Sequence, residues 1–332
     1  MYTLCTTLES VKLASQVFSA SEYVILDCEG RELGTRAGAL SLVCLGDPEG
    51  RNVFIYDILS LPPEALQLLF SEVLDTVDSD STKRKIKVVW DGRMDYSELF
   101  FGHNYSLDHT LDLQLIDVST RALRGESDNS RLRRICRRDF PWPKVMKLQL
   151  EGVYVLNSMD SALREHCVVS APPKSDVVKT MHRNGNSNFW MKRPLSPVLL
   201  NYAADDIRRI AALYRRFLGL GYLNQSRLST FLERSNRYDT DCRLRGRPDQ
   251  QDKFQFNPYL PLGSLEGPVS AESSSQCTKC FRSLAMSHFP YYATRKEVHD
   301  GRYIGAKNSR PGYSVCTIRN FMYHIFSDMS FQ

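Results

Sequence analysis

The alternation of apolar and polar residues predicts a helix followed by strands in the first 60 residues. Apolar residues recur at helical spacing over residues 7–20, which indicates a short amphipathic helix. Turn-forming residues then separate three short apolar runs, at 23–28, 40–45 and 53–58. Because the connections between these runs are short, we expect neighbouring antiparallel strands.

Further along the chain the pattern changes from strands to helices. Residues 64–74 carry one apolar stripe and predict a helix, and residues 85–90 predict a fourth strand. Residues 111–123 predict a mixed apolar helix, whereas residues 170–188 are rich in Ser, Pro, Asn and Gly and predict a long loop. The strongest helical periodicity covers residues 198–218.

Carboxylates follow two of the predicted strands. Asp27 and Glu29 stand where the first apolar run ends, and Asp95 comes shortly after the fourth. Side chains alternate across a strand, so Asp27 and Glu29 share one face. Two adjacent carboxylates repel, and Mg²⁺ or Mn²⁺ is the usual compensating cation because hard ions prefer oxygen ligands. Taken alone, an acidic strand end is also common in any α/β protein.

The late helix adds a tyrosine and a third acidic position. Tyr202 and Asp206 are four residues apart and therefore lie on one helix face. Without the carboxylate one turn away, Tyr202 would be interpreted as a packed aromatic residue.

Composition indicates a globular chain longer than one typical domain. The chain has 332 residues, 42% hydrophobic residues, 24% charged residues and a net charge of +5. No run of eighteen apolar residues and no basic leader followed by an apolar core occurs. Nine cysteines lack the spacing of a disulfide framework. We therefore expect a soluble intracellular protein, cytoplasmic or nuclear, with free thiols and no membrane partner.

Arginines are densest between residues 121 and 138. Such a run is either a solvated helix face or a surface that contacts the phosphate backbone of a nucleic acid. The second interpretation assigns nucleic-acid binding to the arginines of one short segment, Arg131, Arg133, Arg134, Arg137 and Arg138.

The C-terminal third differs in composition from the rest. We expect a main domain over 1–225, a linker over 226–275 and a small segment over 276–332. Cys277 and Cys280 form half of a zinc-site spacing, and Cys316 offers a third thiolate. His288, His299 and His324 are alternatives for the fourth ligand, so the segment is either a structural Zn²⁺ knuckle or a thiol-only one.

The ordered set of acids and the tyrosine resembles the DEDDy group of 3′-5′ exonucleases, of the RNase D and Werner-exonuclease type. The set comprises Asp27-x-Glu29, Asp95 and Tyr202-x-x-x-Asp206. The Asp-Leu-Gln at 112–114 and Trp190-x-x-Arg193-Pro194-Leu195 also match that family's flanking segments. The resemblance covers residues 8 to 220.

The resemblance implies a ribonuclease H-like α/β fold, with a mixed sheet of about five strands and helices on both faces. Four strands are predicted above, and the fifth lies either in 144–154 or after Thr110. It also implies two divalent cations, Mg²⁺ or Mn²⁺, ~3.5–4 Å apart. By similarity Asp27 bridges both ions, Glu29 and Asp206 hold the ion that activates water, Asp95 holds the other, and Tyr202 orients the water.

The implied activity is removal of nucleoside monophosphates from the 3′ end of single-stranded RNA or DNA. A nucleic-acid-binding adaptor with a silent exonuclease fold is the alternative. Such adaptors usually lack a metal carboxylate, and here all four acids are present. For Arg193 the sequence leaves two roles, packing at the start of the last helix or a phosphate contact, and the first is favoured.

Overall fold

The fold was analysed in a computed structural model. It describes residues 1–75, 84–138, 141–146, 150–183, 187–240, 243, 246–247, 258–266, 274–276 and 283–285. The chain divides into two compact units, one formed by 1–128 with 156–258 and the other by 129–155 with 259–332. Each unit is considered by itself.

A six-stranded mixed sheet forms the centre of the first unit. Its order is β1-β4-β3-β2-β5-β6. The pairs β2·β3 and β3·β4 are antiparallel, as their short connections predicted, and the other three pairs are parallel. The strands are β1 (Thr3–Cys5), β2 (Tyr23–Arg31), β3 (Ala39–Gly46), β4 (Val53–Asp57), β5 (Ile86–Val89) and β6 (Thr110–Asp112).

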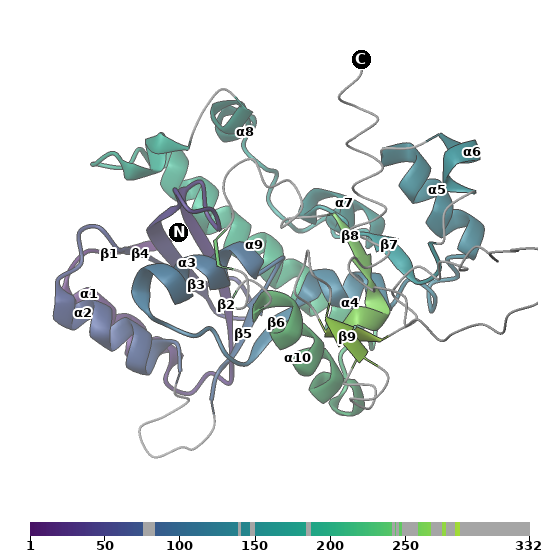
Figure 1. Cartoon of the computed structure of the whole chain (residues 1–332). Helices are drawn as coiled ribbons and strands as arrows, with labels where there is room; N and C mark the ends of the chain where they lie inside the picture. The colour runs from purple at the N-terminus through teal and green to yellow at the C-terminus, as the bar shows by residue number, and fades with distance from the viewer. Residues whose placement is uncertain are drawn as a thin grey trace, which may run out of the picture. The chain divides into compact units, whose positions relative to one another are not determined.

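Helices cover both faces of this sheet (Figure 1). Along β2, Val24 and Leu26 pack toward one face, whereas Ile25 packs toward the other, as strand alternation requires. The first face is covered by α1 (Leu8–Phe18), α2 (Pro63–Leu68) with its π-helical continuation (Leu69–Val73), and α3 (Arg93–His103). The second is covered mainly by α9 (Pro197–Gly219).

Local sequence explains where the two best-predicted helices begin. The Thr7 side chain accepts a hydrogen bond from the Ser10 backbone N–H, which caps α1. Ser196 caps α9 in the same way through Leu199 N–H, and Pro197 occupies the first helical position. Both helices match the ranges that the apolar periodicity predicted.

The predicted helix over 111–123 is partly wrong. Its first residues belong to strand β6, and the helix that follows, α4 (Leu113–Ser119), begins only after Asp112. Asp112 ends the strand and caps the helix, since its carboxylate accepts from Gln114 N–H at 2.8 Å. Of the two places left open for a fifth strand, the segment after Thr110 is the one that joins the main sheet. The edge strand β1 was not predicted.

Two segments predicted without regular structure contain helices. The predicted loop over 170–188 contains α8 (Asp176–Arg183), which lies after α7 (Met159–Glu165) and is followed by a 3₁₀ turn at Asn188–Met191. The predicted linker begins in error, because α10 (Gln225–Asp239) packs against β6 and buries Phe231 and Tyr238. Apolar positions on one face of α10 outweigh its polar composition.

The second unit contains short elements. Its described helices are α5 (Asp128–Arg138) and α6 (Trp142–Val145), and strand β7 (Val153–Val155) pairs with β8 (Tyr259–Pro261), which a 3₁₀ turn (Leu262–Leu265) follows. A second antiparallel pair consists of β9 (Ser274–Gln276) and β10 (Ser283–Ala285). The proposed zinc ligands Cys277, Cys280 and Cys316 lie outside the described residues. Within the part of the chain that is described, no helix is long and apolar enough to span a bilayer.

Candidate active site

Three of the predicted carboxylates converge between β2 and α9. Asp27 and Glu29 project from β2, and Asp206 projects from α9, which packs across that strand. One carboxylate oxygen from each of the three lies within 4.8 Å of the others. Residues from distant parts of the chain, 177 and 179 positions apart, therefore form a single acidic cluster.

Asp95 adjoins this cluster from the opposite side of the strand. It lies in the first turn of α3, and its Oδ1 accepts a hydrogen bond from the backbone N–H of Cys28 at 2.8 Å. Cys28 stands between Asp27 and Glu29, so this bond ties α3 to the strand segment that carries the acids. Burial raises the pKa of Asp95 to about 7, and the hydrogen bonds from Cys28 oppose that rise.

Burial and mutual repulsion dominate the electrostatics of the cluster. Burial is the largest cause that raises the pKa of Asp27 well above its ordinary value, and Asp95 and Asp206 raise it further. The pKa of Glu29 is raised well above its ordinary value in the same way, by burial and then by Asp27 and Asp206. An arrangement of this kind favours a cation at the point where the carboxylates meet.

Two basic side chains contact the cluster, and no motif or periodicity in the sequence predicts either of them. Lys174 Nζ lies 3.5 Å from Asp206 Oδ2, and Arg209 Nε lies 3.4 Å from Asp206 Oδ1. Burial raises the pKa of Asp206, and both cations oppose this. Arg209 also donates to the Pro172 carbonyl at 3.0 Å and contacts Asp160, which holds the segment carrying Lys174 against α9.

Tyr202 lies one turn before Asp206 on the same helix and is buried. Burial and the Asp206 carboxylate raise the pKa of its phenol, so the hydroxyl stays protonated and can hydrogen-bond to a neighbouring oxygen. Lys174 Nζ lies 5.0 Å from the centre of the Tyr202 ring, and the Trp190 and His182 rings each lie 6.2 Å from it. The tyrosine is therefore held between aromatic neighbours and the acidic cluster.

The structure distinguishes the two adjacent aspartates of α9. Asp206 is buried in the cluster, whereas Asp205 is one-third exposed and pairs with Arg208 at 2.6 Å. Tyrosine-plus-four spacing thus identified the residue that faces the strand. Asp205 provides a matched control for any experiment on Asp206.

Arg193 has the structural role that the sequence favoured. Its guanidinium makes two bonds of 2.6 Å to the buried carboxylate of Asp57 and donates to Ser41 Oγ at 2.9 Å. It also donates to the Trp190 carbonyl at 2.8 Å. These bonds attach the chain preceding α9 to the ends of β3 and β4.

The Asp-Leu-Gln segment supports the loop before α3. The Asp112 carboxylate accepts from the backbone N–H groups of Asp91 and Gly92, both at 3.1 Å. Gln114 accepts from the Tyr238 hydroxyl at 3.0 Å, and Arg93 stacks over the Tyr238 ring at 4.6 Å. These contacts fix the start of the helix that presents Asp95.

The arginine segment lies in the second unit, on α5. Arg131 is buried and donates to the carbonyls of Leu150 and Val153 at 2.6 and 2.5 Å, which is a structural role. Arg133, Arg137 and Arg138 are exposed, and Arg134 is half-buried. Nucleic-acid binding by this segment stays a prediction.

The donor set fits hard divalent cations. Three carboxylates meet, two of them buried and one half-buried, and a fourth adjoins them; oxygen donors of this type are the ligands that Mg²⁺ and Mn²⁺ prefer. Structural Zn²⁺ sites use thiolates and imidazoles instead, and none of these belongs to the acidic group.

Comparison with solved structures identifies proteins that share this fold. RNase D from Trypanosoma brucei matches with 22% identity and a TM-score of 0.53, covering 75% of this chain and 74% of that one. The complex of that enzyme with RNA U12 matches with 19% identity and a TM-score of 0.54, covering 85% of this chain and 90% of that one. Its GMP complex matches with 19% identity and a TM-score of 0.55, covering 85% of this chain and 82% of that one. No protein-family model and no curated protein matched. The chain has the ribonuclease H-like fold of the RNase D exonucleases.

Proposed function

We propose that this protein is a two-metal-ion 3′-5′ exonuclease that hydrolyses single-stranded nucleic acid and releases nucleoside monophosphates. The observation that carries the proposal is the convergence of Asp27, Glu29 and Asp206 within 4.8 Å, with Asp95 bonded to the same strand. Among the described residues, these four carboxylates, three of them buried, have only one lysine and one arginine in contact, and this excess of negative charge favours bound cations. If these carboxylates had only a structural role, their mutual repulsion would destabilise the fold without any compensating interaction.

The roles we propose are those that the resemblance to the DEDDy exonucleases implies for these positions. Asp27 stands at the centre of the cluster and would contact both ions, while Glu29 and Asp206 would hold one ion and Asp95 the other. When bound, two divalent ions activate water and stabilise the leaving oxygen of an in-line phosphodiester displacement. Tyr202 would orient the attacking water through its protonated hydroxyl.

Lys174 would serve the substrate once cations occupy the cluster. Its ammonium is 3.5 Å from Asp206 and is one-quarter exposed, so it reaches the site from the solvent side. A bound cation would compete with it for the Asp206 carboxylate. The displaced ammonium would then be available to a phosphate oxygen of the strand.

RNA is the substrate we favour. The fold is shared with T. brucei RNase D, of which a complex with RNA U12 is known. No contact in the described residues of this chain selects a 2′-hydroxyl, so DNA has to be tested in parallel.

The test is a time course on a 5′-labelled single strand, RNA and DNA separately, with Mg²⁺, Mn²⁺ or EDTA. Wild type is compared with Asp206→Asn and with the matched control Asp205→Asn. We expect a ladder that shortens from the 3′ end, is abolished by EDTA and by Asp206→Asn, and persists in Asp205→Asn. Strand binding without cleavage in either metal would reject the enzyme and support the silent adaptor.

A further inference from the structure

A cavity lies at the far end of the strand and the helix that carry the acidic cluster. It encloses about 340 Å³. Tyr23 starts the strand that carries Asp27 four residues later, and Tyr214 follows Asp206 by eight residues on α9. At ~3.3 Å per strand residue and ~1.5 Å per helix residue, the cavity is roughly 12–13 Å from the carboxylates.

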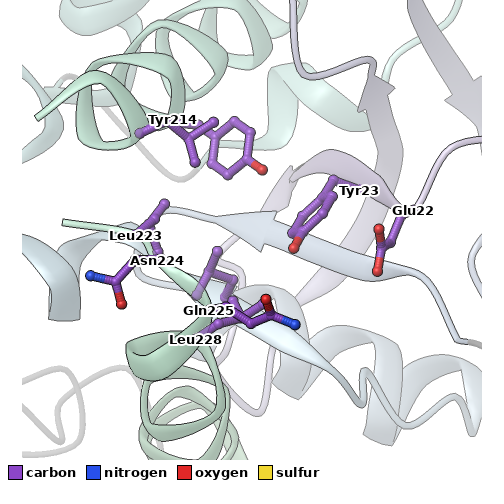
Figure 2. Close-up of a pocket in the computed structure, with 9 residues that line it drawn as sticks. Glu22, Tyr23, Tyr214, Leu223, Asn224, Gln225 and Leu228 are labelled. Atoms are coloured by element: carbon purple, nitrogen blue, oxygen red, sulfur yellow. The ribbon is translucent and has the colours of Figure 1, made fainter. Parts of the chain in front are cut away.

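The walls of this cavity suit a flat apolar surface. The Tyr23 and Tyr214 rings lie 5.7 Å apart at 36°, and leucines of β6, α9 and α10 complete the lining. Figure 2 shows the labelled side chains converging from β2, α9 and the start of α10. A volume of this size falls in the range of small-ligand sites, and aromatic walls favour a planar ring.

Polar groups at the rim of the cavity determine which planar ring could hydrogen-bond there. Glu22 contributes a carboxylate, Gln225 an amide, and Tyr23 and Tyr214 phenols, whereas the amide oxygen of Asn224 already accepts from Ser226 and from Arg227 N–H. In Figure 2 the Gln225 side chain extends toward the side from which Glu22 and Tyr23 project. The described residues that line the cavity include one acid and no Lys, Arg or His, so a phosphate or other anion finds no cation there.

We propose that this cavity binds a guanine base. Guanine carries two adjacent N–H donors, N1–H and N2–H, which one carboxylate accepts together, and Glu22 offers that carboxylate. Its neighbouring O6 accepts from the Gln225 amide NH₂, and the ring packs between the tyrosines and leucines. Adenine presents an acceptor at N1 beside its amino group, and uracil and cytosine fill less of the volume.

The test is ligand-observed NMR of guanosine and adenosine in EDTA, where no divalent ion occupies the acidic cluster. We expect saturable guanosine binding, with adenosine at least fivefold weaker. A paired carboxylate contact is worth roughly 5- to 150-fold in affinity, and Glu22 is exposed, so Glu22→Gln should lower affinity about fivefold or more. Leu228→Trp, which fills the cavity, should abolish binding.

Controls separate this site from the metal centre and from misfolding. Glu233→Gln changes an exposed carboxylate on the same helix α10 and should leave guanosine affinity unchanged. Asp27→Asn should also leave it unchanged, because the cluster is at the other end of β2. Thermal melts confirm that each variant is folded.

Competition between guanosine and the oligonucleotides UUGUU and UUUUU distinguishes a guanine within a strand from a free nucleoside. Stronger competition by UUGUU than by guanosine identifies a guanine within a strand, and competition by guanosine alone identifies the free nucleoside. No saturable guanosine binding up to its solubility limit, or binding that Asp27→Asn removes and Leu228→Trp spares, overturns the proposal. The binding assay needs no cleavage, so its outcome is independent of the exonuclease activity.

Discussion

Replacing Asp27 by Asn should stabilise the metal-free protein while it removes metal binding. Asp27 is half-buried beside the buried Glu29 and Asp206, and one carboxylate oxygen of each lies within 4.8 Å of the others. The amide is nearly the same size as the carboxyl group and carries no charge, so repulsion changes while packing is conserved. The substitution therefore isolates the electrostatic cost of the site.

The magnitude follows from the geometry. Two unit charges 4.8 Å apart repel by about 3 kcal/mol at an effective dielectric constant of about 20. Lys174, 3.5 Å from Asp206, offsets part of this, so we expect the free energy of unfolding in EDTA to rise by about 1–3 kcal/mol. At about 2 °C per kcal/mol, Tm rises by about 2–6 °C.

Calorimetric melts in EDTA and in Mg²⁺ test the prediction. Metal at one hundred times its Kd stabilises the wild type by about 2.7 kcal/mol, whereas Asp27→Asn should gain little, so the stability order reverses when Mg²⁺ is added. The matched control is Asp205→Asn, whose carboxylate pairs with Arg208 away from the cluster. It should show no gain in EDTA and the full gain in Mg²⁺.

Two results would refute the reasoning. A lower Tm for Asp27→Asn in EDTA means that the carboxylate is net stabilising without metal, through contacts stronger than the repulsion. An equal gain from Mg²⁺ in wild type and Asp27→Asn means that the ion binds elsewhere. Either result removes the electrostatic argument for the two-metal site.

Three further predictions concern other residues. Tyr202→Phe should lower the single-turnover cleavage rate about 100-fold or more, with unchanged Tm and strand affinity. A near-normal rate contradicts the proposed role of the hydroxyl. Arg193→Ala leaves the buried Asp57 carboxylate unpaired and should cost about 3 kcal/mol in urea unfolding, partly restored by adding Asp57→Asn. Burial lowers the pKa of Lys87 to about 8, so between about pH 8 and pH 10.5 the unfolded chain binds more protons than the folded one, and the cost of burying the charged lysine is lost as the pH rises through this range. Lys87→Met should therefore raise the free energy of unfolding by up to about 3 kcal/mol near pH 7. An increase that has not disappeared by about pH 10.5 refutes this reasoning.

Local periodicity was enough to predict which acids share a face. A strand repeats every two residues, so Asp27 and Glu29 had to project together, and a helix repeats every 3.6, so Tyr202 and Asp206 had to align. The same reasoning placed the first helix, three antiparallel strands and the long helix α9. These features depend on neighbours in the chain, where the covalent geometry leaves few arrangements.

Tertiary structure decided what periodicity could not. Thr110–Asp112 is a strand because β5 offers it hydrogen bonds, although its apolar pattern continues into a helix. Lys174 reaches Asp206 because Arg209 holds its loop against α9, and no local signal marks that contact. The cavity beside Tyr23 needs β2, β6, α9 and α10 together. Contacts of this kind join segments far apart in the chain, so their free energy appears only when the chain has folded.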